Sequence, residues 1–172
     1  LPDTQKLLAA RMGTPLPEPL QIRPLPVGTS FDSETFRIEI SPDSVTVSAG
    51  GDAGFLYAQG LIRQLIQSMN GSLRDTPVGL PCGVIEDSPS LRDRGYMLDV
   101  SRNRVPTRKT FIELLDLLLV LRYNHLELYF ENVFAYPGHE AIWEKTGTVT
   151  AEDIRFLDAE CTARGIELVP NQ

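Results

Sequence analysis

The segment at residues 92–103 limits the possible fold more than any other part of the chain. It reads RDRGYMLDVSRN, with a short apolar run, Tyr96–Leu98, between groups of charged residues. This run has the length of a buried strand, and Val105-Pro106-Thr107 ends the extended segment before a helix-like pattern begins. Proline suits that position because its fixed φ fits a turn or a first helical residue, while it donates no hydrogen bond to a sheet. A strand, a turn and a helix in this order predict the opening of a βα unit.

Strand and helix patterns continue to alternate after this unit. We expect a helix over residues 107–122, a strand over 124–130, a helix beginning at Thr150 and a third strand over 166–169. The first of these helices is apolar on nearly every side, which predicts packing on more than one face. Thr150 and Asp153 have the spacing of a capping box, so we expect the second helix to begin there.

Three strands of this type are too few to close a parallel barrel, which takes eight strands and about 250 residues. We therefore expect residues 89–172 to be the N-terminal portion of an incomplete (β/α)8 TIM barrel. The alternative is a complete small α/β domain with an open three-stranded sheet. That alternative would leave an exposed apolar edge after Val169, and such an edge promotes aggregation.

Residues 1–88 predict a separate α+β domain, in which a helix covers an antiparallel sheet. Runs at residues 35–40 and 44–48 alternate apolar and polar side chains, and Ser41-Pro42-Asp43 supplies the turn of a hairpin. A helix over residues 53–69 follows, with Asp52 as its N-cap and Asn70-Gly71 at its end. We also expect strands at residues 20–23 and 80–86, and a short helix at 4–12.

Composition excludes several classes of partner. The net charge of −7 argues against nucleic-acid binding, because neutralising phosphates requires a basic surface. No apolar run approaches the roughly 20 residues that cross a bilayer, so we expect no membrane partner. The chain begins at Leu1 and not at Met, which suggests a trimmed or longer protein and leaves its compartment and oligomeric state open. Cys82 and Cys161 are predicted to be two free, buried thiols.

The segment at residues 92–103 resembles a known protein family. Arg94-Gly95 followed by Met97-Leu98-Asp99-Val100-Ser101-Arg102 is similar to the first barrel strand of the family 20 glycoside hydrolases, the β-N-acetylhexosaminidases. The similarity continues to the last residue, and residues 51–67 resemble the accessory domain that precedes the catalytic barrel in that family. The resemblance implies an accessory domain at residues 1–88 and the first part of a catalytic barrel at 89–172.

The family resemblance also implies an activity, the removal of terminal N-acetylhexosamine from glycans or glycoconjugates. In that family a glutamate protonates the leaving oxygen, and an aspartate orients the 2-acetamido group of the substrate, which attacks the anomeric carbon. This Asp–Glu pair follows the fourth strand, beyond Gln172, so we expect no catalytic residue and no turnover in this chain alone. The expected partner is a carbohydrate, with no cofactor. The alternatives are a non-catalytic carbohydrate-binding or interaction module of the same fold, and an unrelated α/β barrel enzyme.

Arg94 is the first substrate-binding candidate, because the resemblance implies that the matching arginine reaches hydroxyls of the terminal sugar. A guanidinium suits this role, since its rigid fork binds two neighbouring hydroxyls at once. The alternative for Arg94 is a structural salt bridge with Asp93 or Asp99. For Asp99 and Arg102 we favour a structural pair across a tight turn over a sugar contact.

The second strand departs from the family pattern. Glu127 and Tyr129 stand where the family has histidines, and Asn132 replaces the first of two aspartates, with Glu131 just before it. An asparagine can hydrogen-bond a sugar but cannot accept a proton, and Glu131 can compensate for it. We therefore predict Arg94, Glu131 and Asn132 as substrate-binding residues.

The long loop at residues 131–149 contains residues that invite several interpretations. His139 lies in a Pro-Gly-His sequence, but the similar family motif follows the third strand, so we interpret His139 as a loop residue without a fixed role. Tyr136 and Trp143 could either stack on a sugar or pack the loop. His125 and His139 have no recognisable metal-binding spacing, so no metal site is predicted.

Overall fold

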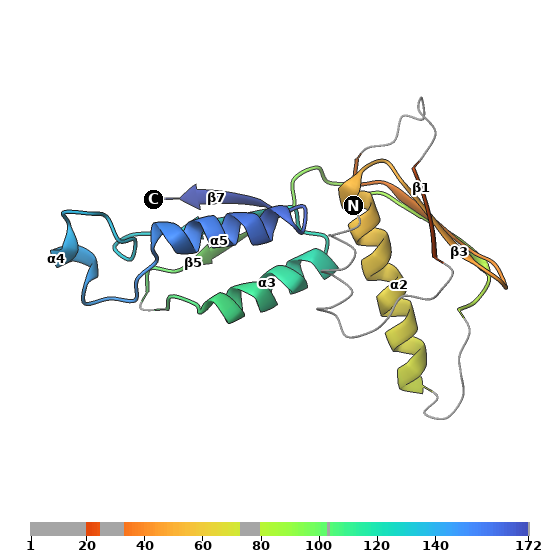
Figure 1. Ribbon diagram of the computed structural model, residues 1–172, viewed down its shortest axis with the longest axis horizontal. Helices are drawn as coiled ribbons and strands as arrows, with labels where there is room; N and C mark the ends of the chain where they lie inside the picture. The colour runs from red at the N-terminus through yellow and green to blue at the C-terminus, as the bar shows by residue number, and fades with distance from the viewer. Residues whose placement is uncertain (1–19, 25–32, 73–79, 103, 172) are drawn as a thin grey trace. The chain divides into compact units, whose positions relative to one another are not determined.

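The computed structural model describes residues 20–24, 33–72, 80–102 and 104–171 (Figure 1). The chain divides into two compact units, residues 1–90 and 91–172, and each is described here by itself. The predicted boundary lay between residues 88 and 89. The helix predicted at residues 4–12 lies outside the described residues.

The first unit contains a four-stranded sheet in the order β1-β3-β2-β4. Its strands are β1 (Leu20–Pro24), β2 (Phe36–Ile40), β3 (Val45–Ala49) and β4 (Gly83–Asp87). The predicted hairpin is present as the antiparallel pair β2–β3, in which Ile38 lies opposite Val47. Strand β1 pairs in parallel with β3, so the sheet is mixed and not purely antiparallel as predicted. The prediction missed this pair because β1 and β3 are not neighbours in sequence.

Helix α2 (Asp52–Ser72) covers one face of this sheet, on which Phe36, Ile38 and Val47 are buried (Figure 1). Gly54 allows the close approach, because a Cβ atom at this position would lie 2.5 Å from the carbonyl oxygen of Thr35. The helix continues to Ser72, past the Asn70-Gly71 pair that was predicted to end it. An asparagine–glycine pair tolerates a left-handed C-cap but does not require one.

The second unit contains a three-stranded parallel sheet in the order β5-β6-β7. Its strands are β5 (Gly95–Asp99), β6 (His125–Tyr129) and β7 (Glu167–Asn171). Helices α3 (Arg108–Val120) and α5 (Ala151–Thr162) pack on one face of the sheet. The core between helices and strands includes Phe111, Leu115, Leu118, Leu126, Leu128, Leu157 and Cys161.

Both helices of the second unit begin at threonine caps. The hydroxyl of Thr107 accepts a hydrogen bond from the backbone N–H of Thr110 at 3.2 Å. The predicted capping box of α5 is present: Asp153 N donates to Thr150 Oγ1 at 3.1 Å, and Thr150 N donates to Asp153 Oδ2 at 3.0 Å. These short-range bonds satisfy backbone donors that a helix start leaves without partners, so local sequence is sufficient to predict them.

Two expectations for this unit were wrong in detail. Helix α3 buries one stripe of side chains, whereas Leu117 and Leu121 on its other side are exposed, so within the described chain it does not pack on several faces. Strand β7 extends through Pro170 to Asn171 and does not stop at Val169. Proline is tolerated there because no described strand pairs with the free edge of β7.

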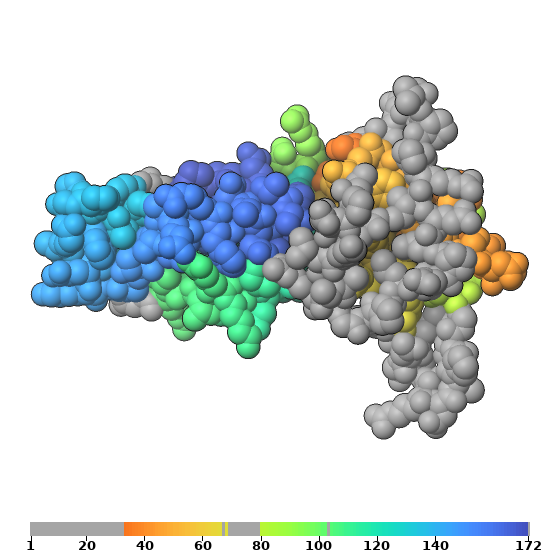
Figure 2. All heavy atoms as spheres, viewed as in Figure 1, coloured from red at the N-terminus to blue at the C-terminus, as the bar shows by residue number. Residues whose placement is uncertain are grey.

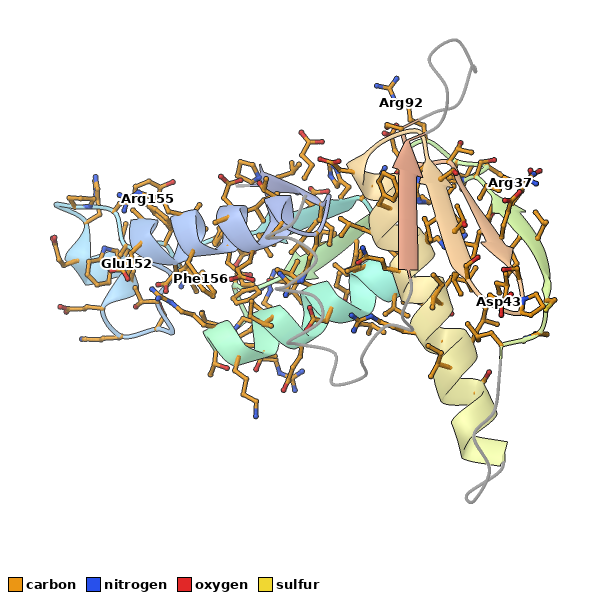
Figure 3. All side chains as sticks on the ribbon, turned by 45° about the vertical axis from the view of Figure 1, so that its right-hand side comes forward. Arg37, Asp43, Arg92, Glu152, Arg155 and Phe156 are labelled. Atoms are coloured by element: carbon orange, nitrogen blue, oxygen red, sulfur yellow. The ribbon has the colours of Figure 1, made fainter. Side chains whose placement is uncertain are left out.

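Charged side chains join α3 to α5 at two places. Arg164, only 2% exposed, donates from Nε to Asp116 Oδ1 at 2.8 Å and from Nη1 to Glu160 Oε2 at 2.7 Å. Near the start of both helices, Arg108 forms an ion pair of 3.0 Å with Glu152, and its guanidinium lies 4.9 Å from the centre of the Phe156 ring. Glu152 and Phe156, both on α5, are labelled in Figure 3. These contacts set how the two helices lie across the sheet.

Both cysteines are free thiols, but only Cys161 is buried, whereas Cys82 is exposed. The prediction of two buried thiols is therefore wrong for Cys82. Burial among apolar side chains raises the pKa of the Cys161 thiol to about 12. Among the described helices, none has both the length and the apolar character that a membrane span requires.

Candidate functional site

The parallel sheet of the second unit has one apolar face and one polar face. Successive strand residues point to opposite faces, and Leu98, Leu126 and Leu128 face α3 and α5. The strand register places Glu127 beside Val169, and Tyr129 between Asp99 and Asn171. These side chains alternate with the leucines and occupy the face that the two helices do not cover. Across this face, the amide of Asn171 donates a hydrogen bond to the carboxylate of Glu127.

Four polar side chains meet where β5 and β6 end, and we call Asp99, Arg102, Tyr129 and Glu131 the carboxyl-edge cluster. Arg102 Nη2 donates to Glu131 Oε1 at 2.9 Å, and the Tyr129 hydroxyl donates to the same oxygen at 3.1 Å. Arg102 Nε lies 3.6 Å from Asp99 Oδ2, so the predicted pair across the turn is present. Glu131 thus joins the loop after β6 to the turn after β5.

Hydrogen bonds set the charge of this cluster. The pKa of Asp99 is held below its usual range, first by the hydroxyl and backbone N–H of Ser101, which donate to Asp99 Oδ1 at 2.6 and 2.8 Å, and then by Arg102. The pKa of the Tyr129 hydroxyl is raised because it donates to the Glu131 carboxylate. Near neutral pH the site therefore presents an ionised Asp99 and a neutral phenol, and neither shift suits a proton transfer at that pH.

The cluster has the chemistry to bind hydroxyl groups. Its carboxylates accept hydrogen bonds, and the guanidinium of Arg102 donates them in a planar fork. The Arg102 side chain is 70% exposed, so a ligand can reach it. The arrangement can therefore hold and orient a polyhydroxylated molecule.

Arg94 lies at the other edge of the sheet. It immediately precedes β5, and its guanidinium donates to the backbone carbonyls of Leu91 at 2.6 Å, Arg92 at 3.1 Å and Arg122 at 2.5 Å. Asn124 Oδ1 accepts from the backbone N–H of Arg94 at 2.9 Å. These bonds tie the amino end of β5 to the turn before β6. A five-residue strand is roughly 15 Å long, so the structure does not bring Arg94 together with Glu131.

Asn132, the third predicted binding residue, is exposed and adjoins Glu131 at the start of the loop. Its backbone carbonyl accepts from Thr146 Oγ1 at 3.4 Å. Of the three predicted residues, Glu131 and Asn132 are therefore at the carboxyl edge and Arg94 is not. Tyr129, which departs from the family pattern, was not predicted as a site residue. The alternation of strand residues could have placed it on the same face as Asp99.

The loop after β6 contains a short helix, α4 (Glu140–Trp143). His139 directly precedes α4, is exposed, and donates its backbone N–H to Tyr136 O at 3.2 Å. Its imidazole is not part of the carboxyl-edge cluster. Within the described ranges, no group of three or more His, Cys, Asp or Glu side chains could hold a metal ion.

Comparisons with known proteins bear on this site. No family model matches the sequence. A β-hexosaminidase from Akkermansia muciniphila is 27% identical over 161 residues, which is 82% of this chain and 31% of that protein. The chain thus spans less than a third of that relative.

Solved structures have the same fold. A family 20 β-N-acetylglucosaminidase matches with a TM-score of 0.77 and 25% identity over 99% of this chain and 36% of its own. A second, from Vibrio harveyi and solved with N-acetylglucosamine, matches with a TM-score of 0.73 and 21% identity over 88% of this chain and 26% of its own. In sequence and in fold, the chain resembles the family 20 glycoside hydrolases, as its strand motif at Arg94–Arg102 predicted.

Proposed function

We propose that residues 91–172 form the first three strands of a larger (β/α)8 barrel, and that residues 1–90 form an accessory domain. A pocket of about 180 Å³ beside β7 supports this, because Leu128, Ile154 and Leu168 line it on the helix-covered side of the sheet. A helix that connected β7 to a fourth strand would pack there. The matching relatives are also about three times as long as this chain.

We further propose that the whole protein is a glycoside hydrolase that removes terminal N-acetylhexosamine. The observation that carries this proposal is the carboxyl-edge cluster, because parallel barrels bind their substrates at the carboxyl ends of the strands. In this proposal Arg102 donates to hydroxyls of the terminal sugar, and Glu131 and Asp99 hold its guanidinium in position. Arg102 thus takes the binding role predicted for Arg94, because the Arg94 guanidinium already donates hydrogen bonds to backbone carbonyls.

The described residues bind and orient the substrate, and the bond-breaking groups come from elsewhere in the protein. By the family resemblance, the 2-acetamido oxygen of the substrate attacks the anomeric carbon, an aspartate orients that group, and a glutamate protonates the leaving oxygen. Asp99 and Tyr129 do not transfer protons in this scheme, because their pKa shifts keep one ionised and the other protonated near neutral pH. Asn132 is a candidate hydrogen-bond partner for the same sugar.

The test is hydrolysis by the full-length protein of 4-nitrophenyl N-acetyl-β-glucosaminide and N-acetyl-β-galactosaminide. Arg102→Lys should lower kcat/KM by about 10- to 100-fold, because lost hydrogen bonds from a charged group cost about 1.5–3 kcal/mol. Arg92→Lys is the matched control, since the Arg92 side chain points into solvent (Figure 3). Binding of N-acetylhexosamine without any hydrolysis would instead support a non-catalytic carbohydrate-binding module.

A further inference from the structure

The uncovered face of the parallel sheet holds a carboxylate that lies outside the carboxyl-edge cluster. Glu127, in the middle of β6, stands between Met97 of β5 and Val169 of β7, whose side chains offer it no hydrogen-bond donor. The side-chain amide of Asn171, at the end of β7, donates to the Glu127 carboxylate. In the part of the chain that the structure describes, no cationic side chain pairs with Glu127. Asn171 is therefore its side-chain partner on this face.

This hydrogen bond fixes which way the Asn171 amide faces. The carboxylate of Glu127 and the amide Oδ1 both accept hydrogen bonds, so the amide Nδ2 must be the atom that faces Glu127. The amide Oδ1 then lies on the opposite side of the group. A glutamine or a histidine at position 127 could donate as well as accept, which would allow the amide to turn. Glu127 thus allows a single orientation of Asn171.

The strand register places Asn171 at the carboxyl edge of the sheet. Asn171 stands opposite Tyr129 on β6, and Tyr129 stands opposite Asp99 on β5. Adjacent strands lie about 4.8 Å apart, so the Cα atoms of Asn171 and Asp99 are roughly 10 Å apart. The backbone of Asn171 is held in the sheet, because its carbonyl accepts a hydrogen bond from Phe130 N at 2.8 Å. Asn171 therefore extends the row of polar side chains onto the third strand.

Strand β7 is an accessible part of the second unit. It packs beside α5, and in Figure 2 its atoms, in the darkest blue, are visible next to that helix. Within the described ranges no strand pairs with its free edge, and Asn171 is only partly buried. A ligand can therefore reach the Asn171 amide.

The hydrogen-bonding groups of the cluster leave a use for this amide. A sugar hydroxyl donates one hydrogen bond and also accepts, and Arg102 supplies donors only. Asp99 Oδ1 already accepts two hydrogen bonds from Ser101, and Glu131 Oε1 accepts two as well. Asn171 Oδ1, by contrast, accepts no hydrogen bond from the described residues. It is an oriented acceptor at the same edge of the sheet.

We propose that Asn171 Oδ1 accepts a hydrogen bond from a hydroxyl of the terminal sugar, and that Glu127 is the positioning residue that keeps this oxygen facing the sugar. This inference rests on the proposed function, in which the carboxyl-edge cluster holds that sugar. Arg102 then donates to the sugar from the β5 side, and Asn171 accepts from it on the β7 side.

The test of Asn171 combines variants of the full-length protein with deoxy substrates. The substrates are 4-nitrophenyl N-acetyl-β-glucosaminide and its 3-deoxy, 4-deoxy and 6-deoxy analogues, each of which lacks one hydroxyl. Asn171→Ala should lower kcat/KM for the parent substrate about three- to tenfold, because one hydrogen bond is lost. For one of the three analogues the same substitution should change kcat/KM by less than about twofold, since the partner hydroxyl is already absent.

The test of Glu127 exchanges donor and acceptor. Asn171→Asp alone brings two carboxylates together and should lower kcat/KM for the parent substrate about tenfold. When Glu127→Gln is added, the glutamine amide donates to the aspartate, whose second oxygen faces the sugar, and kcat/KM should recover to within about threefold of the unmodified protein. Glu167→Gln is the matched control, because Glu167 begins β7 and its side chain is 77% exposed. It should change kcat/KM for none of the four substrates.

A purely structural pair would also be restored by the exchange, but its loss would not depend on the substrate. An Asn171→Ala loss that is equal for all four substrates, or no loss for the parent substrate, therefore overturns the inference while the proposed function stands. A double variant no better than Asn171→Asp overturns the positioning role of Glu127.

If the unmodified protein hydrolyses none of these substrates, the proposed function fails and binding alone decides the inference. Titration calorimetry with N-acetylglucosamine is then the measurement. Weaker binding by Asn171→Ala than by Glu167→Gln supports the contact with the sugar. Equal affinities, or no binding by the unmodified protein, overturn it.

Discussion

Removal of Asp116 should destabilise the second unit, because it leaves a buried cation with one partner fewer. Arg164, two residues after the end of α5, is 2% exposed and reaches Asp116 on α3 and Glu160 on α5. A hydrogen bond to a charged group contributes about 1.5–3 kcal/mol, and breaking a fully buried ion pair costs about 3–5 kcal/mol. Asp116 itself is partly exposed and Glu160 remains, so we expect Asp116→Ala to cost about 2–3 kcal/mol.

Urea denaturation of the 172-residue chain, followed by Trp143 fluorescence, measures this loss. The single tryptophan lies in the second unit, so the signal reports that unit alone. The variant should lower the denaturation midpoint without changing the slope with denaturant.

The matched control is Asp93→Ala, whose carboxylate lies 4.0 Å from Arg92 in an exposed pair. Such surface pairs contribute about 0–1 kcal/mol, so the midpoint should hardly move. Equal effects of Asp116→Ala and Asp93→Ala would refute the reasoning, because the guanidinium of Arg164 would then be solvated and not buried.

Two further predictions follow from the titratable groups. The pKa of Asp153 is lowered by hydrogen bonds from the hydroxyl and backbone N–H of Thr150 and then by Arg108. The ionised Asp153 carboxylate therefore stabilises the folded state fully above the pKa of an unfolded aspartate, near 4. This stabilisation is lost as the pH falls through the lower pKa of the folded state. Thr150→Ala should lower the free energy of unfolding by about 1 kcal/mol at neutral pH and make stability less dependent on pH in the acid range. Thermal unfolding between pH 2 and 7 measures both effects, and an unchanged pH profile would contradict the role of the cap. Cys82 should react with a thiol reagent such as DTNB in the folded chain, whereas Cys161, buried and with its pKa raised to about 12, should react only after unfolding. Two thiols titrated at the same rate under native conditions would contradict that assignment.

Most elements could be predicted because their signals are local. The period-two pattern at residues 35–40 and the helical period after Gly51 depend only on side chains a few residues apart. The Thr150–Asp153 capping box is likewise a short-range structure. The parallel pairing of β1 with β3 was missed, since pairing depends on contacts between distant segments.

The candidate site was predicted only in part. Glu131 and Asn132 were placed correctly after β6 because any loop that follows a parallel strand lies at its carboxyl edge. Arg94 and Arg102 both flank the same short strand, and the sequence contains no local sign of which guanidinium is accessible. The Arg94 guanidinium is bonded to backbone carbonyls from the segment before β5 and from the turn before β6, whereas Arg102 meets Glu131 from the loop after β6.

The order of strands, helices and caps in this chain follows from its sequence, because hydrogen bonding and burial within one element are decided by neighbouring residues. Tertiary structure alone decided which arginine is presented with Glu131, and which carboxylate accepts from the Asn171 amide. Those outcomes depend on contacts between residues that are far apart along the chain, such as Arg102 with Glu131 and Arg94 with Arg122. Only the folded sheet and its register bring such residues within bonding distance.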